Sequence, residues 1–421
     1  MAILIIAIFT CFLFWRYEYA LCAIFALTPV LYELLFSGSL SIFHVLTAVA
    51  FLIFLFRRKK IVAHKEKFPF VMVTVLTVLS QCLTNFASTS PHWPSAFGFI
   101  IVNYLVLIPF WYIIQNRRNQ SFFIRCMLGM IVVVEVYALF ESSVGYNPFF
   151  DWLSTTSMNM YGGDGESAMR LDMVRCHSII AGTGAFGLYC SLAFCFLFSL
   201  LQQTRYKRNR PVLIMLIILS VVCVFLTVTR SCIAALGVGV VLIILFSKIK
   251  IRYKFLFVAL ALVGMSLSGG FFDTILNSFV DTESVEGSNT DMRAEQLAIT
   301  LQVASQHPFL GNGIDTAANA MEIYRLLYGA ESVWFQLLMN FGILGVVALV
   351  YNFISYFRIS FKRRNIIAVA AVAIYLVNKT LTTAPGIDEG FYMMLVMFLL
   401  FYNSNKKANE VNRYHHYPSN P

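Results

Sequence analysis

The sequence predicts an all-α, polytopic integral membrane protein, and three observations support this fold class. Hydrophobic residues make up 59% of the 421 residues and charged residues only 12%, about half the charged fraction of an ordinary soluble domain. The mean hydropathy is +0.75. Apolar runs of about 17–25 residues, long enough to cross a bilayer, recur along the whole chain. We therefore expect a single polytopic domain, 1–421, with about 12–13 transmembrane helices.

The first apolar run is short, which leaves the number of spans at twelve or thirteen. No basic residue precedes that run and no small-residue cleavage site follows it, so it is interpreted as an anchor rather than a removable signal peptide. Eight of the nine cysteines lie in or beside apolar segments, and this distribution indicates no disulfide framework. The expected spans lie near residues 2–15, 19–36, 39–56, 68–86, 96–115, 122–141, 178–201, 211–229, 231–248, 255–270, 331–357, 366–384 and 387–403.

Basic clusters occupy alternate gaps between these spans and predict the orientation. They include RRKK at 57–60, RYKRNR at 205–210 and KRR at 362–364. The positive-inside rule places them in the cytoplasm, and most acidic residues then lie on the outer side. The net charge of +10 is interpreted as an orientation signal and as contact with anionic lipid of the bilayer. Nucleic acid is not an expected partner.

Two outer loops are long in this topology. The first, 142–177, contains NPFFDW and GGDGES, and the second covers 271–330; the tail, 404–421, is cytoplasmic. Between Thr290 and Pro308 the second loop predicts one amphipathic helix. Its apolar and polar faces separate at helical spacing: Met292, Leu297, Leu301 and Ala304 share one face, and Arg293, Gln296 and Thr300 share the other. We interpret the loop as a lid or substrate cradle, with a solvated connector as the alternative.

The chain lacks the Walker, dinucleotide-binding, HExxH and CxxC motifs, and no cluster has metal-ligand spacing, so no cofactor or metal is predicted. Charged residues in or beside apolar segments, where burial is energetically costly, are more informative about the functional site. Arg230 lies between two apolar segments and Arg293 on the predicted loop helix; together they could grip a diphosphate bidentately. Snorkelling of Arg230 and solvation of Arg293 are the alternatives.

Several other ionisable residues lie in apolar segments near the expected outer ends, where they are functional candidates. A salt-bridge network that only holds the bundle together is the alternative. Asp388 and Glu389 are expected at the same outer rim. The residues within the segments are Glu33, His44, Glu135 and Lys379.

Several short motifs resemble one known family. RAEQL at 293–297 precedes HPFLGNG at 307–313, and ES at 331–332 is followed nine residues later by GILG at 342–345. This block resembles the C-terminal region of the O-antigen ligase and O-antigen polymerase superfamily. Thr229-Arg230-Ser231 is similar to a second family signature. The run from Arg170 to Ser178 resembles the region that precedes a central helix in many members.

The resemblance implies a type C glycosyltransferase-like fold in the bacterial inner (plasma) membrane, with its active site facing the periplasm and no metal. Undecaprenyl-diphosphate-linked glycans serve as donor and acceptor. Arg230 and Arg293 match the diphosphate-binding arginines. The ligase branch has His at the position of Glu331, so the polymerase branch is favoured. Glu331 is then the expected proton acceptor for the attacking hydroxyl, and a helix-capping role is its alternative.

The predicted function is polymerisation of lipid-linked repeat units of O-antigen, a part of lipopolysaccharide, or of another surface polysaccharide, with a chain-length regulator protein as a further partner. The alternatives are the ligase reaction and a lipid-linked sugar transporter or flippase. Transporters often have inverted repeats and broken helices, and the sequence shows neither. The catalytic candidates are Glu331, Arg230 and Arg293, and the substrate-binding candidates are Arg170, Arg175, His177, Ser231, Arg325, Lys379 and Glu135.

Overall fold

The computed structural model describes residues 2–37, 40–88, 90–156, 169–170, 173–246, 290–324, 330–382 and 387–414. The predicted span at 255–270 lies outside these residues, as do most of the second loop before Thr290 and the GGDGES segment. Within the described chain almost everything is helical. The exceptions are two short antiparallel strand pairs: β1 (Leu35–Ser37) with β2 (Leu40–Ser41), and β3 (Met169–Arg170) with β4 (Met173–Val174).

The helices confirm the predicted all-α polytopic membrane class. Among the described residues, four helical stretches are long and apolar enough to cross a membrane: Trp93–Ile113, which joins α6 (Trp93–Ile100), the π-helical turn η1 (Ile101–Leu105) and α7 (Leu107–Ile113); α8 (Arg117–Val144); α10 (Thr183–Leu201); and α17 (Val333–Lys362). Shorter apolar helices accompany them: α1 (Ala2–Trp15), α2 (Tyr17–Ala26), α5 (Val71–Ala87), α11 (Arg210–Leu226), α12 (Arg230–Phe246), α18 (Ile366–Leu381) and the apolar part of α19 (Ile387–Tyr414).

Two expected spans are not single regular helices. The run near 19–36 divides into α2 and α3 (Thr28–Glu33). Pro29 lies in the first turn of α3, the helix position at which the missing N–H of a proline costs little, and it therefore fits the start of a new helix. The run near 96–115 contains the π turn η1. The run near 39–56 becomes α4 (Ile42–Val62), which begins at the capping residue Ser41.

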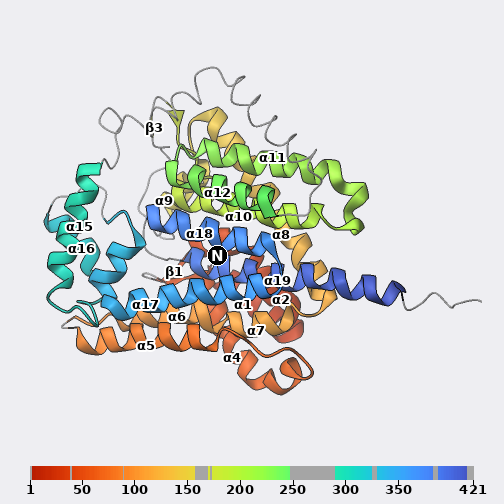
Figure 1. Cartoon of the computed structure of the whole chain (residues 1–421), viewed down its shortest axis with the longest axis horizontal. Coiled ribbons are helices and arrows are strands. Elements are labelled where there is room, and N and C mark those ends of the chain that lie inside the picture. Colours follow the sequence, from red (N-terminus) through yellow and green to blue (C-terminus); the bar gives the residue numbers. More distant parts are fainter. Residues whose placement is uncertain are drawn as a thin grey trace, which may run out of the picture.

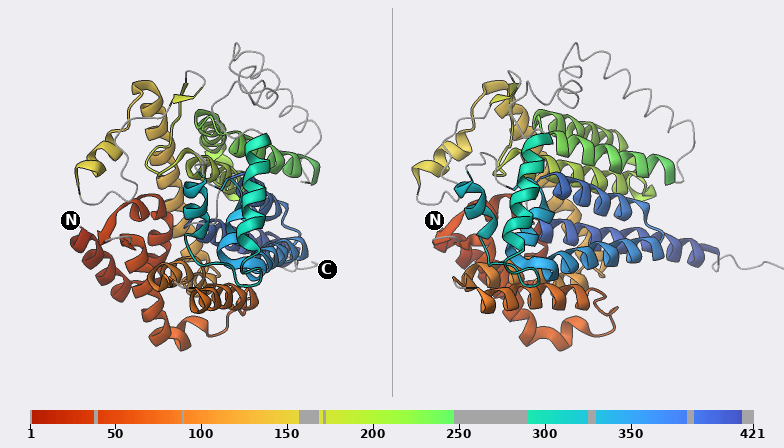
Figure 2. Two further views of the ribbon diagram at one scale, coloured as in Figure 1. Left: turned by 90° about the vertical axis from the view of Figure 1, so that its left-hand side faces the viewer. Right: turned by 60° about the vertical axis from the view of Figure 1, so that its left-hand side comes forward.

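The bundle places α12, α18, α17 and α5 in a row, each packed against the next, while α10 packs against α11, α12, α18 and α19 (Figure 1). Close helix contacts depend on glycine: a Cβ on Gly187 would lie 2.6 Å from the Cys232 sulfur, and one on Gly239 would lie 2.4 Å from Ile374. We call the end where α12, α17 and α19 begin and α18 ends the loop end. There α15 (Thr290–Ala304) lies across the helix ends, with α16 (Thr316–Ile323) beside it (Figure 2).

α17 is broken at Gly342, so the expectation that the chain contains no broken helix was wrong. Gly342 has φ 61° and ψ −158°, a combination that is essentially restricted to glycine. A Cβ at this position would also lie 2.6 Å from the backbone nitrogen of Gly311. The glycine is therefore required both by its own backbone conformation and by the close approach of the preceding loop.

The HPFLGNG segment, 307–313, occupies this break. The N–H of Ile343 donates to the carbonyl of Pro308 (2.9 Å), and the N–H of Asn312 donates to the carbonyl of Met339 (2.9 Å). Backbone groups freed by a helix break inside an apolar bundle need such partners. The motif therefore has a structural explanation: it closes the broken helix and fixes the loop that leads from α15 to α16.

α15 has the predicted position but packs in the opposite sense to that of a usual amphipathic helix. Gln296 and Thr300, from the polar face, are buried, whereas Leu297 and Leu301 are exposed. The reason is a specific contact: the side-chain oxygen of Gln296 accepts the N–H of Glu331 at 3.2 Å. The polar face is thereby used to attach α15 to the start of α17.

Candidate active site at the loop end

The first part of the site is the junction between α11 and α12. Arg230 is the first residue of α12 and is half-buried. Arg175, from the segment before α10, reaches the same junction and donates to the hydroxyl oxygens of Thr183 (2.8 Å) and Thr229 (3.3 Å). The structure therefore places two arginines that are far apart in the sequence on the same short turn. Ser231 follows and is buried in the first turn of α12.

The second part is the end of α18. Lys379 is buried there, and Cys232, two residues after Arg230, lies within electrostatic range of both Lys379 and Arg175. The neighbouring Asn378 donates to the Cys232 sulfur at 3.2 Å. These contacts connect the cationic end of α18 to the cationic start of α12.

The third part is the contact between α15 and the start of α17. Arg293 donates to the carbonyl of Leu381, two residues after Lys379, at 3.4 Å. The same guanidinium lies 3.6 Å from the carboxylate of Glu331. Arg293 thus touches α18 and Glu331 at once, and it connects the second and third parts of the site.

Glu331 is held in place by a hydrogen bond from its backbone N–H and does not cap α17. Its N–H donates to Gln296, as described above, and its carboxylate faces Arg293. Ser332 is the N-cap residue of α17 and makes no side-chain cap hydrogen bond. Within the described residues the Glu331 carboxylate likewise makes no hydrogen bond to the first turn of α17, so the geometry favours a carboxylate that faces the site over one that caps the helix.

We call Arg175, Arg230, Arg293, Lys379 and Glu331 the rim cluster. Four cations and one carboxylate give it a net positive charge, which suits a dianionic or trianionic ligand such as a diphosphate. The side chains of Arg293 and Glu331 are 39% and 22% exposed, and a pair that exposed contributes at most about 1 kcal/mol to stability. The described residues contain no group of His, Cys, Asp and Glu suited to a metal ion.

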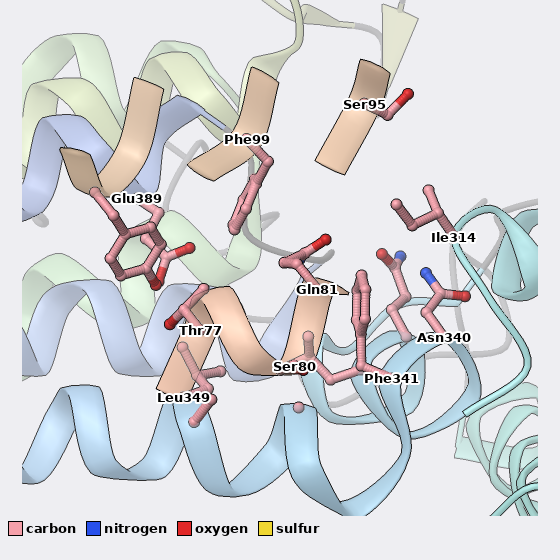
Figure 3. A pocket seen from close by; sticks show the side chains of 15 residues that line it. Thr77, Ser80, Gln81, Ser95, Phe99, Ile314, Asn340, Phe341, Leu349 and Glu389 are labelled. Carbon is pink, nitrogen blue, oxygen red and sulfur yellow. The ribbon is translucent and has the colours of Figure 1, made fainter. Parts of the chain in front are cut away.

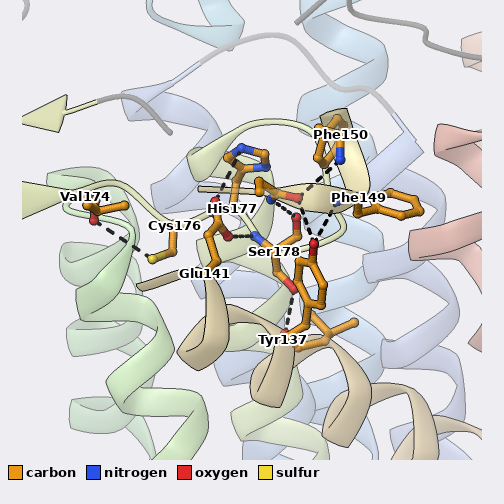
Figure 4. A network of polar contacts seen from close by, with 10 residues as sticks. Tyr137, Glu141, Phe149, Phe150, Val174, Cys176, His177 and Ser178 are labelled. Carbon is orange, nitrogen blue, oxygen red and sulfur yellow. Dashed lines mark hydrogen bonds and ion pairs between the residues drawn. The ribbon is translucent and has the colours of Figure 1, made fainter. Parts of the chain in front are cut away.

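His177 was predicted to bind substrate, and the structure places it in a different network (Figure 4). Its ring nitrogen lies 3.6 Å from Glu141, and its N–H and that of Ser178 both donate to the same carboxylate, at 3.2 and 2.7 Å. The ring meets Phe150 edge to face at 4.8 Å. Burial lowers the pKa of His177 below its ordinary 6.5, and Glu141 partly opposes this effect. The network anchors the segment before α10.

Other predicted residues are distributed through the bundle. Glu135 is buried in the middle of α8, where Ser220 donates to its carboxyl group. Glu33 accepts the N–H of Ala181 at 2.9 Å. His44 belongs to the capping box of α4 with Ser41. None of these contacts joins them to the rim cluster.

Glu389 corrects an expectation. It was expected at the rim, but only 1% of it is exposed, and its carboxyl group accepts the hydroxyl of Tyr104 (2.5 Å) and the amide of Asn352 (3.0 Å). Charge alone suggested a rim position, whereas burial and hydrogen bonding place the residue inside the bundle. The side chains of Arg170 and Asp388, and all of Arg325, lie outside the described residues, so their predicted positions remain predictions.

The residues missed by the sequence analysis line a cavity of about 220 Å³ between α5, α6 and α17 (Figure 3). They include Gln81, Ser95, Phe99 and Asn340. The polar positions of α5 could have indicated it, since Thr74, Thr77, Gln81 and Thr84 recur every three or four residues in an apolar run and mark one polar helix face.

The fold and the site together define a multi-pass membrane protein with a cationic cluster at one end of its helix bundle. Residues 214–350 match a family model described as O-antigen ligase, and this range holds Arg230, Arg293 and Glu331. Over this range, about a third of the chain, the protein is therefore similar to the O-antigen ligase and polymerase superfamily, a group of glycosyl-transferring membrane enzymes. It does not separate the polymerase branch from the ligase branch. No curated protein matches the chain.

Proposed function

We propose that this protein polymerises undecaprenyl-diphosphate-linked repeat units for O-antigen or another surface polysaccharide, at the periplasmic face of the bacterial inner membrane. The donor is a lipid-linked chain and the acceptor a lipid-linked repeat unit, with a chain-length regulator protein as a further partner. The observation that carries the proposal is the contact between Arg293 and Glu331. An arginine suited to bind a diphosphate and a candidate base lie side by side, and both lie within the range that matches the family model.

In the proposed reaction the acceptor hydroxyl attacks C1 of the donor sugar and forms the new glycosidic bond. The bond between C1 and the diphosphate oxygen breaks, and the lipid diphosphate leaves with that electron pair. Glu331 accepts the hydroxyl proton, while Arg230 and Arg293 stabilise the charge on the departing diphosphate. Charge-assisted hydrogen bonds of this kind contribute about 1.5–3 kcal/mol each.

The ion pair between Arg293 and Glu331 implies that donor binding precedes proton transfer to Glu331. A diphosphate that binds Arg293 competes with the Glu331 carboxylate for the guanidinium. Donor binding would therefore release the carboxylate from Arg293 and leave it free to accept a hydrogen bond from the attacking hydroxyl group.

Replacement of Glu331 tests the proposal. Glu331→Gln keeps the size of the side chain but removes its basicity, and loss of a general base costs about 10²–10⁴ in rate. We expect cells with Glu331→Gln or Glu331→Ser to bear single repeat units on their surface glycolipid, because a separate ligase still attaches them. Glycan ladders on gels provide the measurement, and Glu322→Gln, on the exposed helix α16, is the matched control.

The other outcomes separate the rival functions. Long polymer from Glu331→Ser would show that the carboxylate is dispensable and would remove the catalytic role. Long polymer that accumulates on the lipid carrier, with no surface glycan, would identify a ligase. A transporter would instead leave the lipid-linked unit on the cytoplasmic side of the membrane.

The orientation has an independent test. Single cysteines at Gly162, Gly287 and Asp388 in a cysteine-free variant should react with a membrane-impermeant thiol reagent in cells whose outer envelope admits it. Cysteines at Asn209 and Asn365 should not. Labelling of these two alone would reverse the orientation and place the rim cluster in the cytoplasm.

A further inference from the structure

We propose that the cavity between α5, α6 and α17 is a binding subsite for one sugar residue of a lipid-linked glycan. The inference rests on the proposed function, because it assigns a second binding position to the same substrate. The shared chemistry is a ring with several hydroxyl groups, and the donor glycan or the acceptor repeat unit could supply it.

The residues that line the cavity differ in exposure. Its mouth lies at the loop end, between exposed Ser95 at the start of α6 and half-buried Ile314 in the segment after the GNG turn. Its floor is formed by buried Tyr104 and Glu389. The volume of about 220 Å³ lies below the roughly 300–1,000 Å³ of sites for drug-sized ligands, so it suits a single ring rather than an oligosaccharide.

Gln81 is the strongest sign of a missing ligand. Its side chain is 6% exposed and points into the cavity (Figure 3). Among the described residues none donates a hydrogen bond to its side-chain oxygen. A buried amide oxygen without a donor is unfavourable, and a hydroxyl group in the cavity would supply that donor.

The remaining walls fit a sugar better than a hydrocarbon chain. Phe99 and Phe341 contribute aromatic surface, against which the C–H face of a sugar ring packs, and Ser80 and Asn340 contribute further hydrogen-bonding groups. A lipid chain would leave the amide of Gln81 unsatisfied. Specific small-molecule sites combine apolar walls with a few convergent polar groups in this way.

The position of the cavity connects it to the reaction. Gln336 lines it, and the side chain of Gln336 donates to the carbonyl of Ala330 at 2.7 Å. Ala330 directly precedes the candidate base Glu331, so one wall of the cavity contacts the segment that holds the base. A sugar in the cavity would lie on the α5 side of α17, while Arg293 contacts the end of α18.

Photocross-linking tests which ligand occupies the cavity. A benzophenone side chain replaces Ser95 at the mouth, and the control replaces Phe97, which is exposed and lies about 200° around α6 from Ser95. After irradiation of intact membranes from cells making the glycan, we expect mass spectrometry to find glycan attached at position 95 and not at 97. A single repeat unit identifies the acceptor and a long chain the donor. Attachment of acyl or polyprenyl chains alone, or no attachment, overturns the proposal.

Kinetics of the purified full-length protein give a second readout. Gln81→Leu preserves size but removes the amide, and we expect the KM for lipid-linked repeat units extracted from host cells to rise about three- to tenfold, with little change in kcat. The thermal midpoint should not fall, because the substitution removes an unsatisfied buried group. Gln302→Leu, on the exposed face of α15, is the control. An unchanged KM contradicts the proposal.

These experiments fail separately from those on the proposed function. Cross-linking reports occupancy of the cavity, whereas the Glu331 series reports turnover. Glycan at position 95 with normal polymer from Glu331→Gln would retain the subsite and remove the mechanism. Loss of polymer in Glu331→Gln with lipid in the cavity would do the reverse.

Discussion

The two places where this protein gathers charged and polar groups differ in how fully the groups are bonded. In the interior, Glu389 and Glu141 are 1% and 0% exposed, and each accepts at least two hydrogen bonds from the bundle. At the rim, Glu331 is 22% exposed and faces a single guanidinium at 3.6 Å. Glu389 and Glu141 are thus bonded within the bundle, whereas the Glu331 carboxylate is partly exposed, so a ligand can reach it.

The extent of hydrogen bonding therefore distinguishes charged side chains that stabilise the fold from those that act in the site. Their position in the membrane distinguishes them less well. A buried polar group must be bonded, so full bonding shows that the group serves the fold. An exposed ion pair contributes little stability, so its geometry needs another explanation. Substitutions of the bonded interior carboxylates should therefore lower stability, and substitutions at the rim should lower activity.

Removal of the Glu389 side chain should have the largest effect on stability. Glu389→Ala leaves the Tyr104 hydroxyl without the carboxylate that accepts its hydrogen bond, and it removes one of the three acceptors of the Asn352 amide. A buried group left unsatisfied costs about 1–3 kcal/mol, so we expect the protein to lose about that much stability and to accumulate less in the membrane. Thermal unfolding in detergent, followed by size-exclusion chromatography, measures the change.

Glu389→Gln is the matched control, because its amide oxygen still accepts both hydrogen bonds. It should be closer to the unsubstituted protein than Glu389→Ala in thermal midpoint. Equal stability of both variants with the parent protein, combined with loss of polymer, would move Glu389 from the structural group to the functional one.

The rim arginines should show the opposite pattern. Arg230→Lys and Arg293→Lys retain the charge but lose the planar fork that binds a diphosphate bidentately. We expect about tenfold or greater loss of polymerisation rate, equivalent to one charge-assisted hydrogen bond, with normal membrane levels and an unchanged thermal midpoint. Arg118→Lys, exposed at the other end of the bundle, is the control. Near-normal polymer from both rim variants would end the diphosphate role.

The sequence was sufficient for the parts of the fold that depend on local patterns. Apolar runs predicted the helices, and the cap-type residue Thr290 together with the helix-stopping Pro308 predicted α15. The pattern could not show that α15 packs through Gln296 and Thr300, because that depends on a contact with Glu331, 35 residues away. The break at Gly342 was missed for the same reason: a glycine in an apolar run is compatible with a regular helix, and only the approach of the 307–313 segment requires the unusual backbone.

The site was predictable to the extent that motifs carry it. Arg230, Arg293 and Glu331 follow from the family motifs, and the structure brings Arg293 and Glu331 into contact. Burial was the missing information elsewhere, since Glu389 and Glu135 looked like rim charges when judged by residue type. Gln81 was overlooked because an amide in a membrane helix carries no charge to draw attention.

His177 provides the mildest test of the comparison, because it lies between the two regions. Burial lowers its pKa below 6.5, so below that pH the unfolded chain binds a proton that the folded protein does not. Stability is then fully present above pH 6.5 and falls as the pH drops toward the folded pKa. His177→Gln has no proton to bind, and we expect its thermal midpoint to depend less on pH between 7 and 5.5, with polymer still made. Loss of polymer at a normal thermal midpoint would instead return His177 to the substrate-binding residues. The structure favours the anchor, because Glu141 holds the imidazole and two backbone N–H groups at once and Arg175, two residues earlier, reaches the rim in its place.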